Sequence, residues 1–261
     1  MLWAIQTKMM YKPHEAQILN VLKALGYDYC SFFIAPFANE LPAIDTEKTL
    51  FYGSTTVINS IYESQKWIPG AFFNENFDYR VWYNKYESLN VECLFVKLGE
   101  ITEEHFCGRS HAFIRPVLDL KEFAGSVIKW EDFNNWKQSL INTNMLMDCT
   151  CIVAEPCGLS HEWRVFIVYG QAISASQYCT SHRFNVSAEV PRDVLQFAEQ
   201  QAKIFSPHDI FVMDIGQSND LYYVIEVGCF NSSGFYQCDI AAIFKAVQEM
   251  CEKNESFIMD R

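Results

Sequence analysis

The chain has 261 residues, of which half are hydrophobic and 15% are aromatic, so it can bury one core with a satellite or two modest domains. This composition excludes disorder as the dominant state. Asp and Glu (32) outnumber Lys and Arg (20), and the net charge of −12 argues against sequence-independent binding to nucleic acid, where basic residues supply most of the affinity.

The first hundred residues predict alternating helices and strands. Pro13 is a favourable first residue for a helix, apolar residues then recur at helical spacing, and Gly26 ends the pattern. Short apolar stretches predict strands at 29–35 and 49–52, whereas the aromatic segment 67–86 has no clear period and is expected to be an ordered loop. Polar residues then gather at 99–107, so we expect a small α/β domain over residues 1–100.

The remaining residues, 101–261, predict an α+β domain. Strand and helix patterns alternate there without an internal repeat or a low-complexity segment. The patterns predict strands at 111–116, 149–154, 210–215 and 221–227, a hairpin of 163–169 and 171–177 around Gly170, and helices at 131–140, 193–205 and 240–251.

The sequence also bears on the compartment. Lys8 interrupts the apolar stretch that a signal peptide would need, and no apolar run is long enough to cross a bilayer. The ten cysteines occur in a chain far longer than the secreted scaffolds that depend on disulfides. We therefore expect a cytoplasmic protein with free thiols and no membrane contact, and the sequence does not indicate its oligomeric state.

Two acidic residues, Asp214 and Glu226, interrupt neighbouring apolar strands. The residues between them are typical of a turn, so the strands are expected to form an antiparallel hairpin. With a five-residue loop at 217–221, Asp214 would pair with Val224, and Glu226 would lie diagonally on the same face, with Cβ atoms about 7 Å apart. A four-residue loop would instead put the acids on opposite faces. The same-face arrangement suits a magnesium ion; the alternative is an ordinary solvent-exposed face.

Three basic residues precede the acids. Arg115 ends a strand just before a proline, Lys121 follows in a short loop, and Arg164 lies two residues after Glu162 at the start of another strand. An arginine offers a rigid fork of donors to phosphate oxygens, and a lysine offers a mobile point charge. Each could equally be a partner in a surface ion pair.

The strand 149–154 ends at Ala154-Glu155-Pro156. A strand end that is broken by proline can present backbone groups to the edge of a purine, while its apolar side chains sandwich the ring. This segment is therefore a candidate for binding a base.

In chain order these features resemble the ATP-grasp superfamily, and in particular a phage and bacterial branch in which arginine replaces the usual first lysine. The order of the cations, the proline-ended strand and the two acids carries the resemblance, which covers most of the chain. The stretches that match are Tyr52-Gly-Ser54, Trp67-Ile-Pro-Gly70, Phe113-Ile-Arg-Pro116, Lys121-Glu-Phe123, Glu162-Trp-Arg164 and Asn231-Ser-Ser-Gly-Phe-Tyr236.

The resemblance implies an α+β fold in which two α+β subdomains clasp ATP, preceded by the small α/β domain. It implies ATP and Mg²⁺ as cofactors, and catalysis by cations that balance charge on the transferring phosphoryl group. It assigns phosphate contacts to Arg115 and Lys121, adenine contacts to Ala154 and Glu155, further ATP contacts to Glu162 and Arg164, and magnesium to Asp214 and Glu226.

One position departs from the family pattern. The superfamily usually continues Glu-x-Asn, where the asparagine completes the metal shell, but the chain has Gly228 at that position. Asn231 matches a second asparagine of the branch, so we expect it to act as a metal ligand instead.

The family joins a carboxylate to an amine through an acyl phosphate, so the resemblance implies an ATP- and Mg²⁺-dependent ligase. Its partners would be small-molecule or peptide carboxylates and amines, and not nucleic acid. Gly228 motivates one alternative, an ATP-binding module that has lost ligase activity. A second alternative is an acidic interaction protein that binds no nucleotide.

Overall fold

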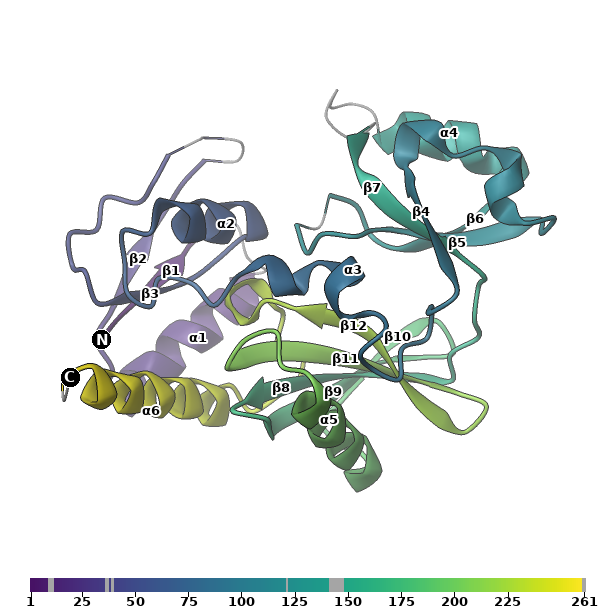
Figure 1. Ribbon diagram of the computed structural model, residues 1–261. Coiled ribbons are helices and arrows are strands. Elements are labelled where there is room, and N and C mark those ends of the chain that lie inside the picture. Colours follow the sequence, from purple (N-terminus) through teal and green to yellow (C-terminus); the bar gives the residue numbers. More distant parts are fainter. Residues whose placement is uncertain (9–11, 36–37, 39, 121, 141–147, 260–261) are drawn as a thin grey trace.

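The computed structural model describes residues 1–8, 12–35, 38, 40–120, 122–140 and 148–259. The described residues form three β-sheets, each with at least one helix packed against it (Figure 1). We call them the N-terminal sheet, the small sheet and the large sheet.

The N-terminal sheet has three parallel strands in the order β2-β1-β3. Parallel neighbours need a crossover connection, and α1 supplies it between β1 and β2. Ile18 and Leu22 of α1 are fully buried, and the chain leaves the helix through Gly26 at a positive φ of 70°. The helix predicted from Pro13 is thus confirmed, while the strand predicted at 29–35 is shorter. The elements are β1 (Leu2–Gln6), α1 (Lys12–Leu25), β2 (Tyr29–Phe32), β3 (Thr49–Tyr52) and α2 (Thr55–Ser64).

The aromatic segment that lacks a clear period connects this sheet to the next. It contains two short helical turns, η1 (Glu75–Phe77) and α3 (Tyr79–Trp82). The rings of Tyr79 and Trp82 pack edge to face at 4.6 Å, and both side chains are buried. The segment is therefore ordered by its aromatic side chains, as predicted.

The small sheet is antiparallel with the order β4-β7-β5-β6, and α4 covers one of its faces (Figure 1). Along β5, Ala112 and Ile114 are buried in a core with Phe133 of α4, whereas Phe113 and Arg115 lie on the other face. The elements are β4 (Cys93–Lys97), η2 (Leu98–Glu100), η3 (Glu103–Phe106), β5 (His111–Pro116), β6 (Ser126–Lys129), α4 (Trp130–Leu140) and β7 (Thr150–Ala154).

The strands β4 and β6 were not predicted from the sequence. β4 pairs with β7, so hydrogen bonds of the small sheet cross the proposed division between residues 1–100 and 101–261. That division remains a proposal.

The large sheet is antiparallel with the order β10-β9-β8-β11-β12. Alternate residues of β8 and β11 face opposite ways: Val165 and Met213 pack with α5, and Phe166 and Val212 pack toward α6. The predicted hairpin around Gly170 is confirmed, and β10 extends it. The elements are β8 (His161–Val168), β9 (Gln171–Thr180), β10 (Arg183–Ser187), α5 (Arg192–Ile204), β11 (Ile210–Ser218), β12 (Leu221–Gly228), η5 (Phe230–Ser232) and α6 (Ile240–Met259).

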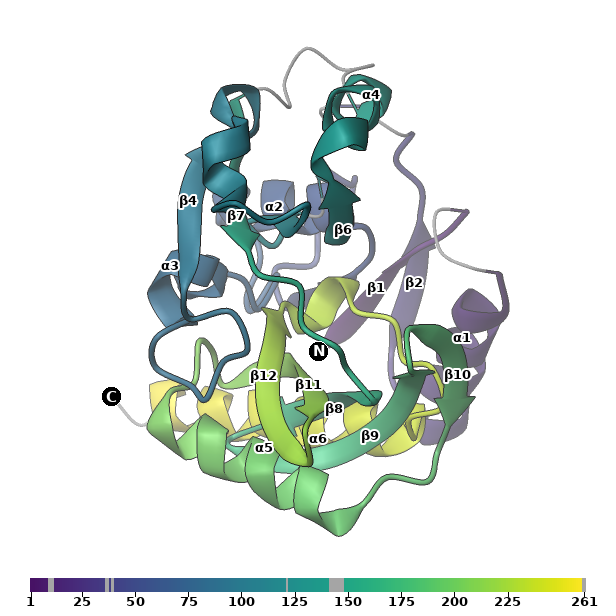
Figure 2. The same ribbon diagram turned by 90° about the vertical axis from the view of Figure 1, so that its right-hand side faces the viewer.

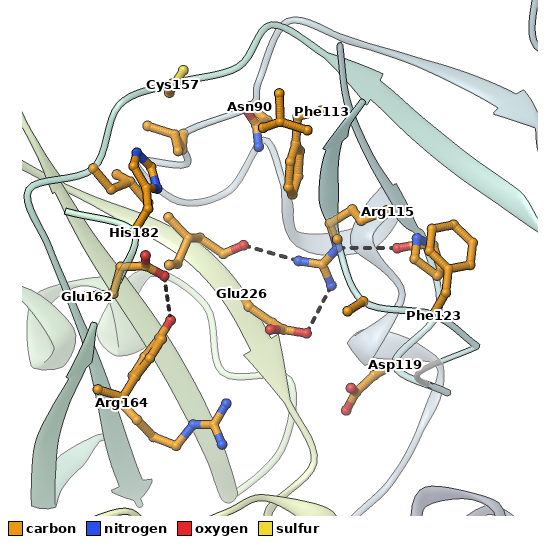
Figure 3. Close-up of a pocket in the computed structure, with 18 of the residues that line it drawn as sticks. Asn90, Phe113, Arg115, Asp119, Phe123, Cys157, Glu162, Arg164, His182 and Glu226 are labelled. Atoms are coloured by element: carbon orange, nitrogen blue, oxygen red, sulfur yellow. Dashed lines mark hydrogen bonds and ion pairs between the residues drawn. The ribbon is translucent and has the colours of Figure 1, made fainter. Parts of the chain in front are cut away.

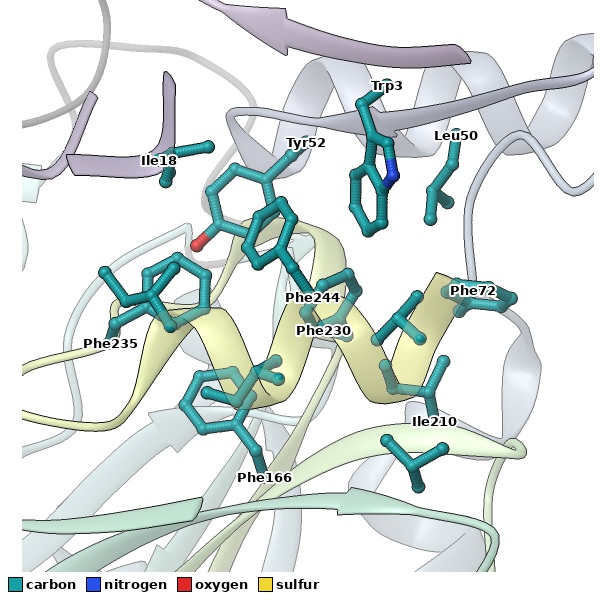
Figure 4. Close-up of a cluster of buried hydrophobic side chains, with 14 of the residues drawn as sticks. Trp3, Ile18, Leu50, Tyr52, Phe72, Phe166, Ile210, Phe230, Phe235 and Phe244 are labelled. Carbon is teal, nitrogen blue, oxygen red and sulfur yellow. The ribbon is translucent and has the colours of Figure 1, made fainter. Parts of the chain in front are cut away.

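An aromatic core joins the N-terminal sheet to the large sheet (Figure 4). Trp3 of β1 lies 4.4 Å from Phe244 of α6, and its indole N–H donates to Gln248 at 2.9 Å. On the large sheet, Phe166 stacks on Phe235 at 5.2 Å. The N-terminal sheet is therefore fixed to the large sheet by shared side chains.

The small sheet stands over the large sheet (Figure 2). The mixture of a parallel N-terminal sheet with two antiparallel sheets confirms the predicted α+β class. All ten cysteines lie within the described residues, and each is a free thiol, as predicted. Among the helices of the described chain, none is both long and apolar enough to cross a membrane.

The aromatic core yields a prediction about stability. Phe244→Ala should lower the free energy of unfolding by about 3–5 kcal/mol, because it opens a cavity among Trp3, Tyr52 and Phe230. Urea denaturation followed by circular dichroism measures the loss. The matched control is Phe184→Ala, which removes a ring that is 76% exposed and should change stability by less than about 0.5 kcal/mol. Equal losses in the two variants would contradict the role of the shared core.

Candidate active site

A cavity of about 670 Å³ lies between the small sheet and the large sheet (Figure 3). Its size is typical of sites for small molecules. The small sheet contributes Phe113 and Arg115, and the large sheet contributes Glu162, Arg164 and Glu226. Charged side chains from two sheets thus converge on one cavity.

The hairpin that carries the two acids turns more tightly than predicted. Ser218 pairs with Leu221, so the loop has two residues, Asn219 and Asp220. Both have positive φ, 49° and 63°, which is the conformation of the common two-residue hairpin turn. The predicted five-residue loop at 217–221 is therefore wrong.

A β-bulge nevertheless puts the acids on one face. Continued without a break, the register of the turn would set Asp214 opposite Ile225 and leave Glu226 on the other face. The register instead shifts between Asp214 and Ile215, with Ile225 as the additional residue, so that Asp214 pairs with Glu226. Directly opposed residues share a face, so the conclusion of a same-face pair is right although the predicted diagonal geometry is wrong.

Each of these acids pairs with one of the predicted arginines. Arg164 donates to Asp214 through Nε at 2.9 Å and through Nη2 at 2.8 Å, and both side chains are almost fully buried. Burial alone lowers the pKa of the Arg164 guanidinium, but the charge of Asp214 and its hydrogen bonds outweigh burial and raise the pKa. Arg164 therefore stays charged.

The second pair connects the two sheets. Arg115 of β5 donates through Nη2 to Glu226 Oε1 of β12 at 3.1 Å, and through Nη1 to the carbonyl of Ile225 at 3.2 Å. Arg115 thus recognises both the acid and the bulge that orients it (Figure 3). The Glu226 side chain is 35% exposed, so solvent molecules and ligands in the cavity can reach it.

Two tyrosines hold Arg164 from the side. Tyr178 and Tyr236 stack at 5.0 Å, and the Arg164 guanidinium lies 5.9 Å and 5.1 Å from their ring centres. Burial raises the pKa of Tyr178 well above its ordinary value, and the charges of Asp214 and Glu162 raise it further. The phenol therefore remains protonated and donates to Glu162 Oε2 at 2.9 Å.

The other predicted site residues are placed differently. The Glu155 side chain is exposed and pairs with Arg109 at 2.8 Å, and neither it nor Ala154 lines the cavity. The same segment reaches the cavity through Cys157. Lys121 lies outside the described residues. Nucleotide contacts by these residues stay a prediction.

Asn231 lies away from the cavity. It is fully buried, its Oδ1 accepts from the backbone N–H of Phe72 at 2.8 Å, and its Nδ2 donates to the carbonyl of Phe51. These bonds tie η5 to the N-terminal sheet. Because they occupy the amide with the fold, this geometry gives no support to the predicted role of Asn231 as a metal ligand.

The sequence analysis missed Asp119, which follows β5 and lines the cavity. Its carboxylate is 4% exposed and accepts from the backbone N–H of Cys229 at 2.7 Å. An acid between Arg115 and Lys121 in the sequence was the available signal. Within the described residues, no three His, Cys, Asp or Glu side chains are already grouped as a metal site.

Comparisons with known proteins agree on one family. A family model described as an ATP-grasp domain, family 3 of its clade, matches residues 63–247. A search of curated proteins finds no match.

Several solved structures share the fold at low sequence identity. D-cycloserine synthetase DcsG superposes with a TM-score of 0.65 at 11% identity, over 97% of this chain and 99% of that chain. D-alanine–D-alanine ligase from Bacillus anthracis gives 0.63 at 11% identity, over 98% and 99%. The ATP-grasp ligase PsnB, complexed with minimal precursor, gives 0.56 at 12% identity, over 95% and 98%.

The buried ion pair yields a prediction. Asp214→Ala should lower the free energy of unfolding by about 3–5 kcal/mol, because it leaves the Arg164 charge buried without this partner. The control is Asp148→Ala, which breaks an exposed pair with Lys97 and should cost no more than about 1 kcal/mol. Chemical denaturation measures both, and similar small losses would show that the buried pair does not stabilise the fold.

Proposed function

This chain belongs to the ATP-grasp domain family, and on that premise we propose that it is an ATP- and Mg²⁺-dependent ligase that joins a carboxylate to an amine. The predicted ATP-grasp fold is confirmed by the family match and by its structural neighbours. The observation that carries the proposed activity is the pairing of two arginines with two strand acids at one cavity between the sheets.

The charge pattern supports a ligand that carries both signs. In each pair an arginine and a carboxylate already neutralise each other. Either a phosphate or a divalent ion alone would have to compete with one of these partners. A nucleotide bound with magnesium supplies a partner for both, since phosphate oxygens suit arginines and Mg²⁺ suits carboxylates.

The donor set also suits magnesium. Carboxylate oxygens are the protein ligands that Mg²⁺ prefers, and Glu226 presents one to the cavity. An ionised carboxylate has about four acceptor sites, so Asp214 can keep its two bonds to Arg164 and still accept a metal. Asp214 and Glu226 would therefore hold the ion, which when bound neutralises charge on the phosphates.

The basic residues would then divide the anionic groups. Arg115 and Lys121 would bind the phosphates from the side of the small sheet. Arg164 would bind the substrate carboxylate and the phosphoryl group that it receives, with its guanidinium oriented by Asp214 and Tyr178. Donors held in place before the reaction stabilise developing charge without reorganisation.

We propose a reaction in two steps. An oxygen of the substrate carboxylate attacks the γ-phosphorus of ATP, and ADP leaves. The amine then attacks the carbon of the acyl phosphate, phosphate leaves, and the amine loses a proton to give an amide. The substrates are a small-molecule or peptide carboxylate and an amine.

The exchange of partners predicts that magnesium and nucleotide bind together. Mg²⁺ should tighten binding of a non-hydrolysable ATP analogue by roughly 5–150-fold, the usual range for coupled sites. Calorimetric titrations with and without Mg²⁺ measure this. Glu131→Gln, which changes an exposed acid on α4, should keep the full effect as a control. Affinities that do not depend on the metal would refute the proposed site.

Turnover provides the test of the ligase itself. Release of ADP and phosphate should require both a carboxylate and an amine from a substrate panel, and Glu226→Gln should lower the rate about 100-fold or more by weakening the hold on the metal. Glu131→Gln should retain the wild-type rate. Nucleotide binding without turnover on any substrate pair would instead support the binding module, and full activity of Glu226→Gln would exclude that residue from the site.

A further inference from the structure

Asp119 and Gly228 meet at the cavity although they are distant in the sequence. A Cβ atom on residue 228 would lie 3.3 Å from Asp119 Oδ2 and 3.7 Å from Oδ1. The first distance is shorter than nearly all contacts of real Cβ atoms. The Asp119 carboxylate therefore occupies the space into which a side chain at position 228 would extend.

The glycine at position 228 is not required by the backbone. Gly26, Gly70, Gly108 and Gly170 have positive φ, but Gly228 does not. An L-residue could adopt this conformation, so space is the constraint that favours glycine. Gly228 makes room for the carboxylate of another segment.

The position is next to the proposed metal. Gly228 lies two residues beyond Glu226 on β12, so a side chain there would share the face of Glu226. Asp119 and Glu226 both line the cavity, and Figure 3 shows their carboxylates in the same part of it. Asp119 thus brings a second acidic group to the place where residue 228 brings none.

We propose that Asp119 is a ligand of the divalent ion and takes over the place of a side chain at position 228. This inference rests on the proposed function, because it needs the metal that accompanies the nucleotide. A buried carboxylate is costly to desolvate, and a divalent ion offsets that cost better than a backbone N–H does. With Asp119 after β5 and Glu226 on β12, the ion would connect the small sheet to the large sheet.

The rival explanation is that Asp119 only fixes the chain at Cys229. In that case its contribution would be structural, through its bond to the Cys229 N–H, and metal affinity would follow the fold. Asp119→Asn keeps the shape and an acceptor oxygen but removes the charge. It therefore separates the two roles.

The experiment titrates Mn²⁺, detected by its paramagnetic resonance, into protein saturated with a non-hydrolysable ATP analogue. Asp119→Ala and Asp119→Asn should each weaken Mn²⁺ binding by about tenfold or more, since even indirect partners of a metal contribute that much. The double variant Asp119→Ala/Gly228→Asn should regain most of the affinity, because its asparagine enters the vacated space and offers an amide oxygen. Asp132→Ala, an exposed acid on α4, is the matched control and should bind as wild type does.

The outcomes separate this inference from the proposed function. If wild-type protein with the analogue binds no Mn²⁺, both fail. If wild type binds and Asp119→Asn binds equally well, only the role of Asp119 fails. Thermal unfolding of each variant shows whether it folds, and failure of the folded double variant to regain Mn²⁺ also overturns the exchange of ligands between positions 119 and 228.

Discussion

The cavity depends on one additional residue in β12. Side chains alternate along a strand, so without the bulge at Ile225 the acids of β11 and β12 would face opposite ways. The bulge puts Glu226 opposite Asp214, and its carbonyl accepts from Arg115. The bond between Arg115 and Glu226 across the sheets and the buried pair of Arg164 and Asp214 both follow from this geometry.

The three sheets contribute differently to this arrangement. The N-terminal sheet shares an aromatic core with the large sheet and α6, so these two form one support. The small sheet buries its outer face in a separate core with α4 and presents Phe113 and Arg115 to the cavity. One wall of the site is therefore built on a continuous core, and the other belongs to a layer with its own.

The sequence predicted what local patterns control. Helical spacing located α1, α4 and α5 within a residue or two, and turn composition located the hairpin of Asp214 and Glu226. It could not supply the register, because a two-residue turn and a bulge together give the same face as a five-residue loop. It also missed β4, β6 and β10, whose pairing is set by neighbours in space, and Asp119, whose contact with Cys229 spans 110 residues.

The tight approach between Asp119 and Gly228 has an evolutionary consequence that does not depend on any ligand. At 3.3 Å from a Cβ, the two positions cannot both carry the larger group without displacing each other. Substitutions at them should therefore be correlated across descendants of this chain: a lineage that gains a side chain at one position is under steric pressure to shorten the other. The two positions act as one unit of selection, which neither shows when it is considered alone.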